Sequence, residues 1–291
     1  MTERNIPGLT PSLRRRMRWL FRSLGFLSPA IAARLAMFLF LTPLARRVDA
    51  SEAAFLATAR HHLLDTPLGH VHAYEWPQAG PTVLVVHGWI SHAARLEAVI
   101  RALLARGLRV VAFDAPAHGR SAGTQVDLHG FRAAIAASER ELGPCSAIVA
   151  HSFGALTSAT WLAESPPAAM RAAVLIGLPR DIGYLFESYV YAMALSPAVV
   201  ARLRTLFRQR YGGEPEDYSA RELAARIHLP VLLVHGGADE LVPAAQAYEI
   251  AEQLSHGTVM VVEGLRHSAP LRDPATIDAL VAFLYRHLQH V

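Results

Sequence analysis

The sequence of 291 residues contains no lysine, and its only cysteine is Cys145. A lone cysteine excludes a disulfide framework and a metal centre built from several cysteines, and it fits a reducing compartment. Charged residues make up only 18% of the chain, whereas 52% are hydrophobic, and the mean hydropathy is +0.24. These values argue against a disordered chain. They indicate one large globular domain, with or without an appendage.

Several further features are missing from the sequence. It has no run of 18 uncharged apolar residues, so it predicts no ordinary membrane-spanning helix. It has no Gly-x-Gly-x-x-Gly or other phosphate-cradling loop, which argues against nucleotide use. The histidines His92, His118, His151 and His235 lack the helical spacing and carboxylate support of a metal site. We therefore expect neither a metal nor another cofactor.

Positive charge is concentrated at the N-terminus. Residues 1–47 hold nine arginines and one acid, Glu3, a net charge of +8, whereas residues 48–291 hold 19 arginines and 23 acids, a net charge of −4. The sequence pI of about 9.6 therefore describes the N-terminal arm and not the body. Because the body lacks a basic surface with interleaved aromatic residues, we expect no nucleic-acid binding.

From Pro81 onward, short apolar runs alternate with longer helical patterns. The runs are apolar throughout, as is typical of strands that are buried on both faces of a parallel sheet. Strands are predicted at residues 82–86, 109–113, 146–150, 173–177, 231–235 and 258–262. Helices are predicted at residues 93–106, 128–142, 154–164, 244–253 and 273–287. This order predicts an α/β fold with a mostly parallel sheet flanked by helices, and residues 69–76 read as an antiparallel lead-in strand.

Two segments interrupt the alternation. Residues 1–65 read as a basic and apolar helical extension, in which residues 51–64 have the pattern of an amphipathic helix. Residues 180–228 interrupt the main domain of residues 66–291, and their first half is helical and apolar. An insertion at the carboxyl edge of such a sheet lies above the ligand site, so we predict a lid. Phe186, Tyr189 and Met193 are expected to contribute to substrate binding, with ordinary packing as the alternative.

The N-terminal arm has three interpretations. Its basic stretch, with Trp19 and Phe21, suits peripheral contact with anionic lipid at the inner membrane surface. Arg15-Arg16 has the appearance of a twin-arginine targeting signal, although no cleavage site follows. Residues 29–44 also suit packing across the body or a partner, which the interruptions at Arg34 and Pro43 favour. We expect a cytoplasmic protein, with or without this membrane contact.

The strongest local motif is Ala150-His151-Ser152-Phe153-Gly154, which joins a predicted strand to a predicted helix. A serine on such a tight turn has its hydroxyl raised above the sheet, at the N-terminus of a helix. The usual pattern is Gly-x-Ser-x-Gly, and the small Ala150 replaces the first glycine. The alternative is a serine that only caps the helix.

A serine nucleophile needs a base that is oriented by an acid. Asp239 follows the strand at 231–235 and His267 follows the strand at 258–262, so both fall at the carboxyl edge of the sheet in the chain order Ser, Asp, His. Asp181 is an alternative acid. For the oxyanion hole, we expect the backbone N–H groups of Phe153 and Trp89, since Gly88 lets the chain turn toward the site.

Together, His87-Gly88-Trp89, the block from Phe113 to Ser121, the Ser152 turn, Asp239 and His267 resemble the α/β-hydrolase superfamily over about residues 68–291. The resemblance implies the α/β-hydrolase fold, with Asp114 and His118 as structural residues. Ala117, where the family more often has glycine, is a departure. The serine at the turn argues against haloalkane dehalogenase and epoxide hydrolase chemistry, for which the family uses an aspartate.

The resulting hypothesis is a serine hydrolase that cleaves a carboxylic ester or thioester of a lipophilic small molecule through an acyl-enzyme on Ser152. C–C bond hydrolysis, cofactor-free haloperoxidase activity and acyl transfer by the same triad are alternatives. A non-catalytic ligand-binding protein on this fold is another. The sequence predicts neither the natural substrate nor the oligomeric state.

Overall fold

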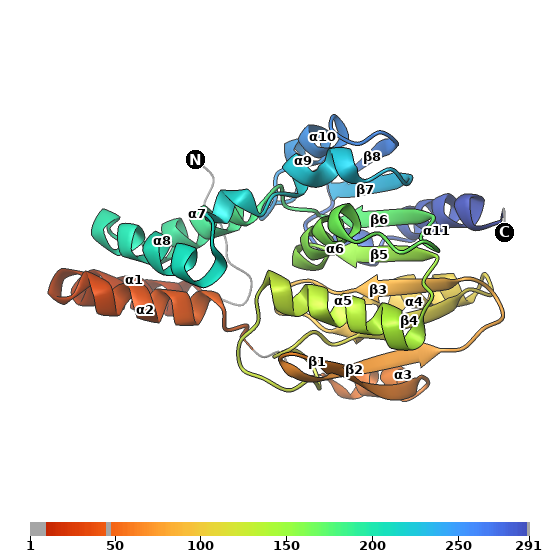
Figure 1. Ribbon diagram of the computed structural model, residues 1–291, viewed down its shortest axis with the longest axis horizontal. Helices are drawn as coiled ribbons and strands as arrows, with labels where there is room; N and C mark the ends of the chain where they lie inside the picture. The colour runs from red at the N-terminus through yellow and green to blue at the C-terminus, as the bar shows by residue number, and fades with distance from the viewer. Residues whose placement is uncertain (1–9, 45–47, 290–291) are drawn as a thin grey trace.

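The computed structural model of the chain describes residues 10–44 and 48–289. At its centre is an eight-stranded sheet with the order β1-β2-β4-β3-β5-β6-β7-β8 (Figure 1). β2 pairs antiparallel with β1 and β4, and all other neighbours are parallel. The strands are β1 (Arg60–Thr66), β2 (Gly69–Trp76), β3 (Thr82–Val86), β4 (Arg109–Phe113), β5 (Ala147–His151), β6 (Ala172–Ile176), β7 (Val231–Gly236) and β8 (Gly257–Val262). The predicted mostly parallel sheet and the antiparallel strand at 69–76 are confirmed.

Helices cover both faces of the sheet. One face packs against α5 (Leu128–Leu142), α6 (Phe153–Glu164) and α10 (Ala245–Ala251), and the other against α3 (Ala50–Leu56), the 3₁₀ turn η1 (Ala93–Leu96), α4 (Glu97–Leu104) and α11 (Pro274–Leu288). Successive residues of a strand alternate between these two cores, because strand side chains point to opposite faces. In β3, Leu84 and Val86 belong to the first core and Val83 and Val85 to the second.

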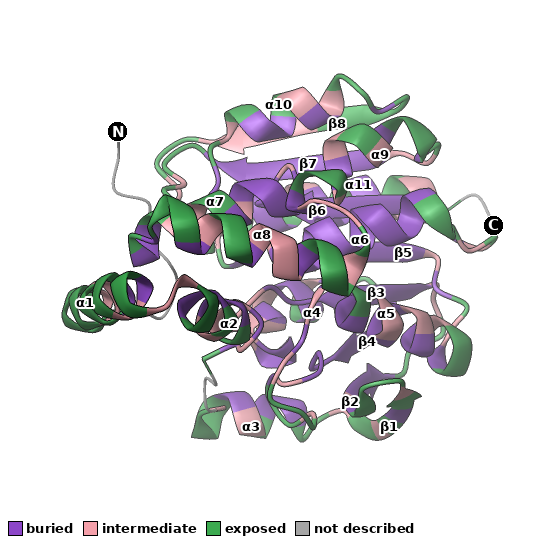
Figure 2. Ribbon diagram, turned by 60° about the vertical axis from the view of Figure 1, so that its left-hand side comes forward, coloured by how far each residue is buried: buried purple, intermediate pink, exposed green. Residues whose placement is uncertain are grey.

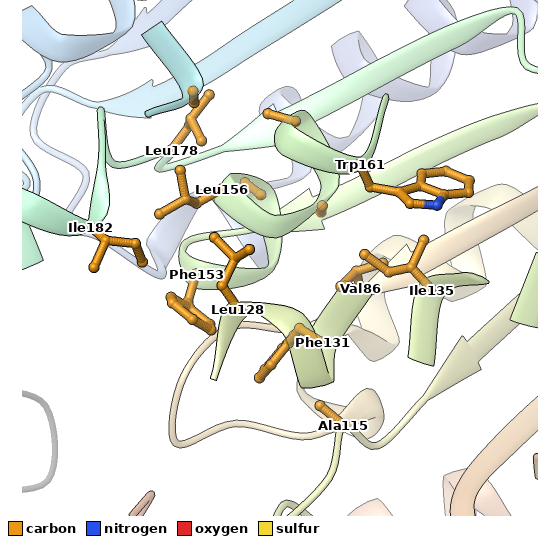
Figure 3. Packing of buried hydrophobic residues seen from close by; sticks show 14 of the residues in the cluster. Val86, Ala115, Leu128, Phe131, Ile135, Phe153, Leu156, Trp161, Leu178 and Ile182 are labelled. Atoms are coloured by element: carbon orange, nitrogen blue, oxygen red, sulfur yellow. The ribbon is translucent and has the colours of Figure 1, made fainter. Parts of the chain in front are cut away.

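The first core fixes the start of α6. Figure 3 shows Phe131 of α5 and Phe153 of α6 side by side, with Val86 of β3 to their right. The two phenylalanine rings meet edge to face, with centroids 5.0 Å apart. All three side chains are buried. Aromatic burial of this kind contributes a few kcal/mol per ring, so it holds the strand-to-helix junction after β5 in place.

The amphipathic helix predicted at residues 51–64 is wrong in its second half. α3 ends at Leu56, and residues 60–66 form β1, an edge strand of the sheet and not part of a helical extension. The residues of β1 pair with β2, and His62 Nε2 lies 2.9 Å from Glu75 Oε2 across the two strands. Leu64 is buried beneath α5. Pairing with β2, the strand that follows directly in the chain, outweighs local helical periodicity here.

The segment predicted as a lid lies between β6 and β7. It consists of α7 (Ile182–Met193), α8 (Pro197–Tyr211), η2 (Pro215–Asp217), α9 (Ala220–Leu223) and η3 (Ala224–Arg226). α7 and α8 extend beyond one end of the sheet, where α1 (Pro11–Leu27) and α2 (Pro29–Phe40) run alongside them (Figure 1). We call α1 and α2 the hairpin. Ser28 closes α1 and caps α2, and Pro29 starts the second helix, so the corner is tight.

The hairpin packs on the predicted lid. α2 contacts α8 and α1 contacts α7, and Ala32, Ala33 and Ala36 of α2 are fully buried. Small side chains let the two helix backbones approach closely. Residues 1–9 and 45–47 of the N-terminal arm lie outside the described residues. Among the described helices, none is both long and apolar enough to cross a membrane.

Candidate active site

Ser152 occupies a sharp turn between β5 and α6. Its backbone φ of 54° and ψ of −122° are unusual for a residue with a side chain, and its N–H donates to the Ile176 carbonyl at 2.8 Å. A Cβ at Gly154 would lie 2.2 Å from the carbonyl oxygen of His87, so only glycine fits there. Ala150 is fully buried and β5 still pairs with β3 at that residue, so alanine is accommodated where glycine is usual.

A continuous chain of hydrogen bonds joins three side chains from separate loops. His267 Nε2 lies 2.8 Å from Ser152 Oγ, and His267 Nδ1 lies 2.7 Å from Asp239 Oδ2. A carboxylate can only accept, so Nδ1–H donates to Asp239 and Nε2 accepts the serine proton. The structure therefore brings together the three residues proposed from the sequence as nucleophile, base and acid.

The buried Asp239 carboxylate is held from several sides. Its Oδ1 accepts the backbone N–H groups of Leu241 at 2.8 Å and Val242 at 2.9 Å. Its Oδ2 faces both His267 and, at 3.3 Å, Nε2 of the buried His235. Burial by itself raises the pKa of Asp239, but hydrogen bonds from His235 and His267 outweigh burial and hold the pKa well below its usual value. The acid therefore stays ionised in the resting protein.

His151 supports the site from beneath, a role that the sequence reasoning missed. It precedes Ser152, is buried, and its Nε2–H donates to the His267 carbonyl at 3.2 Å. Burial and the neighbouring His267 ring lower the pKa of His151 to about 3, so it is neutral at physiological pH. A neutral donor at this point fixes the backbone of the base. The signal in the sequence that could have indicated this role is the position of His151 within the turn motif, directly before Ser152.

The two residues predicted for the oxyanion hole lie beside Ser152. A Cβ at Gly88 would lie 2.9 Å from Ser152 Cβ, so the loop that carries Trp89 runs directly against the serine. Phe153 is the first residue of α6, and the first N–H groups of a helix have no partner within it. The Trp89 and Phe153 rings pack edge to face, with their centroids 5.3 Å apart. That their N–H groups bind an oxyanion stays a prediction.

Two buried histidines shape the loop of residues 87–90. His118 Nε2 accepts the N–H of Ile90 at 3.2 Å and its Nδ1–H donates to the Pro116 carbonyl, while His87 Nε2 accepts the N–H of Ala115 at 2.9 Å. Ile90 has a positive φ of 53°, a conformation that a branched residue adopts only when it is held. Burial lowers the pKa of both histidines, so neutral rings provide the acceptors that the loop requires.

Two other aspartates have structural positions. Asp114 accepts hydrogen bonds from the Tyr74 hydroxyl and from two backbone N–H groups at 2.8–2.9 Å, in agreement with the structural reading from the sequence. Asp181, the alternative acid, caps α7 by accepting the Tyr184 N–H at 2.6 Å and pairs with Arg180. The hydrogen bond from His267 goes to Asp239 instead.

A cavity of about 1010 Å³ opens above Ser152 and His267. Tyr189 and Met193 line it, as proposed. Phe186 is not among the lining residues: it is 1% exposed and packs against the rings of Phe40 and Phe207. Its predicted role in substrate contact is therefore replaced by one in the packing of the predicted lid.

The hairpin also contributes to the wall of the cavity, which the sequence reasoning did not foresee. The lining residues from α1 and α2 are Leu13, Met17, Leu39 and Phe40. They lie more than 100 residues before Ser152 in the chain, so no local pattern connects them to it. Within residues 10–44 and 48–289, no group of three His, Cys, Asp or Glu residues is arranged to hold a metal ion.

Acidification from pH 7 to pH 4 should destabilise the protein through His118. Burial lowers the pKa of this histidine from 6.5 to about 4. Since the folded pKa lies below the unfolded one, unfolding takes up a proton between these values, and stability falls as the pH falls through this window. We expect a loss of up to about 3 kcal/mol from this group. Urea unfolding at both pH values measures the loss, and His118→Gln should reduce it.

The exposed His70 provides the matched control, since His70→Gln removes a histidine without touching the buried loop. This variant should keep the pH dependence of the wild type. If His118→Gln also keeps it, the buried ring is not the source of the acid sensitivity.

Comparisons with known proteins agree with this geometry. Residues 77–179 match the family described as serine aminopeptidase, S33. The bifunctional esterase/perhydrolase of Acinetobacter calcoaceticus is 28% identical over 261 residues, which cover 72% of this chain and 94% of the relative. The monoacylglycerol lipase of Mycolicibacterium smegmatis is 26% identical over 249 residues, covering 71% and 88%. The structure of esterase Pf2001 from Pyrococcus furiosus superposes with a TM-score of 0.66 at 19% identity, covering 85% and 97%.

The sheet order, the strand-to-helix turn at Ser152 and these relatives lead to one conclusion: the chain has the α/β-hydrolase fold and is similar to members of that superfamily. It is a hydrolytic enzyme, and its relatives support an esterase- or lipase-type function.

Proposed function

We propose that this enzyme cleaves a carboxylic ester or thioester of a lipophilic small molecule through an acyl-enzyme on Ser152. The observation that carries the proposal is the unbroken chain from Ser152 Oγ through His267 to Asp239 at the floor of the cavity. Residues able to act as nucleophile, base and orienting acid are within hydrogen-bond reach of one another, as acyl transfer requires.

In the acylation step, Ser152 Oγ attacks the carbonyl carbon of the substrate while His267 Nε2 takes the serine proton. The ionised Asp239 stabilises the imidazolium that forms, and the N–H groups of Trp89 and Phe153 would hold the oxyanion. His267 then gives its proton to the leaving alcohol or thiol as the bond to the carbonyl carbon breaks. The acyl group remains on Ser152.

In the deacylation step, His267 removes a proton from water, which attacks the acyl carbon. The carboxylic acid leaves and the proton returns to Ser152 Oγ, so the enzyme is regenerated. The same acyl-enzyme offers a second reaction, which the relative named as an esterase/perhydrolase favours. Hydrogen peroxide in place of water would yield a peracid, and product analysis with both nucleophiles distinguishes the two.

A lipophilic acyl group is supported by the lining of the cavity. Its wall includes Leu13 and Met17 from α1, Leu185 and Met193 from α7, and the ring of Tyr189. Each methylene that moves from water into such a wall contributes about 0.8 kcal/mol. The volume of about 1010 Å³ is at the large end for small-molecule sites, which leaves room for an extended chain.

Covalent labelling with a fluorophosphonate probe tests the proposal. The wild type should become labelled once per chain, at Ser152, and Ser152→Ala should not. Ser188→Ala removes another serine from the lining of the cavity and should leave labelling intact. Across p-nitrophenyl esters, kcat/KM should rise at least about tenfold from acetate to octanoate, because each added methylene is buried. An unlabelled wild type, or a preference for acetate, would contradict the respective part of the proposal.

A further inference from the structure

The hairpin presents an apolar and cationic face to solvent. On α1 the large exposed side chains recur every seven residues, as Trp19 with Phe26 and Leu20 with Leu27, and on α2 Ile31 recurs with Phe38. Residues seven apart lie on the same side of a helix. We call these six side chains the outer face. Figure 2 shows α1 almost wholly exposed on this side.

The outer face is more exposed than isolated surface residues usually are. Phe26 is 90% exposed, Leu27 77% and Trp19 65%. The corner between α1 and α2, which carries Phe26 and Leu27, lies at the far end of the molecule from the sheet (Figure 1). Large apolar side chains that are exposed at neighbouring positions of a helix mark an interaction surface. Because Phe26 and Leu27 lie at a projecting tip, they are placed to insert into an apolar layer such as a lipid bilayer.

The charge of the hairpin indicates what it contacts. Residues 11–40 contain six arginines and no acidic residue. Arg15 and Arg22, also seven residues apart, are exposed beside Trp19 and Phe26. Residues 48–291 carry a net charge of −4, so the positive charge is confined to the N-terminal side. Exposed aromatic and aliphatic side chains flanked by arginines are the pattern of helices that lie in an anionic lipid interface.

A second copy of the chain suits this face poorly. In a two-fold symmetric dimer the same patch meets itself, so the arginines of one hairpin would face those of the other. Like charges brought together repel, and residues 11–40 offer no acid to offset them.

We propose that the hairpin docks the enzyme on anionic membrane surfaces, with Phe26 and Leu27 immersed among the lipid chains and the exposed Arg15 and Arg22 on the phosphates. This goes beyond the proposed ester hydrolysis and does not depend on it. The same hairpin also lines the cavity through Leu13, Met17, Leu39 and Phe40, so docking would bring the cavity wall to the lipid surface.

Sedimentation of the full chain with lipid vesicles tests the proposal. We expect binding to vesicles with about 30% phosphatidylglycerol in phosphatidylcholine, and weaker binding in high salt or to phosphatidylcholine alone. Phe26→Ser with Leu27→Ser should weaken binding at least about tenfold on anionic vesicles, since it removes the immersed side chains. Arg15→Gln with Arg22→Gln should weaken binding roughly tenfold or more there and abolish the preference for phosphatidylglycerol.

Matched controls come from exposed apolar residues on the body. Leu63→Ser with Tyr248→Ser changes two such residues that lie outside the hairpin and should bind vesicles as the wild type does. Ser152→Ala should also bind as the wild type does, so a failure of the catalytic proposal would not affect this measurement. Equal binding by the Phe26/Leu27 variant and the wild type, or no binding by either, would overturn the proposal. So would self-association of the wild type that is lost in that variant, because the face would then be a dimer contact.

Trp19 provides an independent spectroscopic readout. Trp76 and Trp161 are buried and Trp89 is half-buried, so Trp19 is the tryptophan whose surroundings change on docking. Anionic vesicles should shift the emission of the wild type to shorter wavelength. Trp19→Phe should remove the shift while vesicle binding persists, and a shift that survives in this variant would place the contact elsewhere.

Discussion

Replacing Ser152 with alanine should lower kcat for a p-nitrophenyl ester by about 10⁴- to 10⁶-fold. The variant keeps the cavity and the oxyanion donors but has no oxygen to form the acyl-enzyme, so only the catalysis that these provide remains. Alanine also retains Cβ and the same backbone preferences, so the melting temperature should change little. Stopped assays of purified protein measure the first effect, and thermal unfolding measures the second.

Ser152→Gly separates chemistry from backbone strain. Ser152 has a φ of 54°, which glycine adopts without steric cost. The glycine variant should be as inactive as the alanine variant but more stable than the wild type, by roughly 1 kcal/mol. Turnover by Ser152→Ala at the wild-type rate would contradict the role of this serine. A less stable glycine variant would show that the turn is not strained.

Asp239→Asn should lower kcat by about 10³- to 10⁴-fold with little change in structure. The N–H groups of Leu241 and Val242 require an acceptor at the Oδ1 position, so the amide oxygen of asparagine stays there. The amide NH₂ then faces His267 Nδ1, which must accept, and the imidazole proton moves to Nε2. In this tautomer Nε2 can no longer accept the proton of Ser152.

Asp181→Asn is the control for this variant, because Asp181 is the other acid that the sequence offered. Its carboxylate caps α7 and pairs with Arg180, so the substitution should affect stability by about 1 kcal/mol and leave kcat within a few-fold of the wild type. A large loss of kcat in Asp181→Asn together with a small one in Asp239→Asn would exchange the roles proposed for these two acids.

The sheet was predictable because its strands carry their own signal. Four of the five residues of β3 are apolar, and both faces of that strand are buried, so composition alone identifies it. The positions of Ser152, Asp239 and His267 follow from the same fact. Once the parallel strands are known, the residues that follow them must meet at one edge of the sheet.

What the sequence missed depends on contacts between elements. Residues 60–66 have helical periodicity, but they pair as a strand with β2, which follows them directly in the chain. On α7, Phe186 and Tyr189 are equally apolar, and only the packing of Phe40 and Phe207 decides that Phe186 turns away from the cavity. No local pattern reveals which apolar side chains of the hairpin face inward.

Hydrogen bonds from two side chains tie the hairpin to the predicted lid. Arg18 Nε–H donates to the Ala192 carbonyl at the end of α7 at 2.9 Å, and the buried Tyr189 hydroxyl donates to the Ala36 carbonyl of α2 at 3.0 Å. Tyr189 also lines the cavity, so whatever displaces α2 displaces a side chain that the substrate meets. The proposed docking of the hairpin on a membrane and the binding of substrate in the cavity are therefore linked equilibria. If one strengthens the other, thermodynamics requires both affinities to change by the same factor.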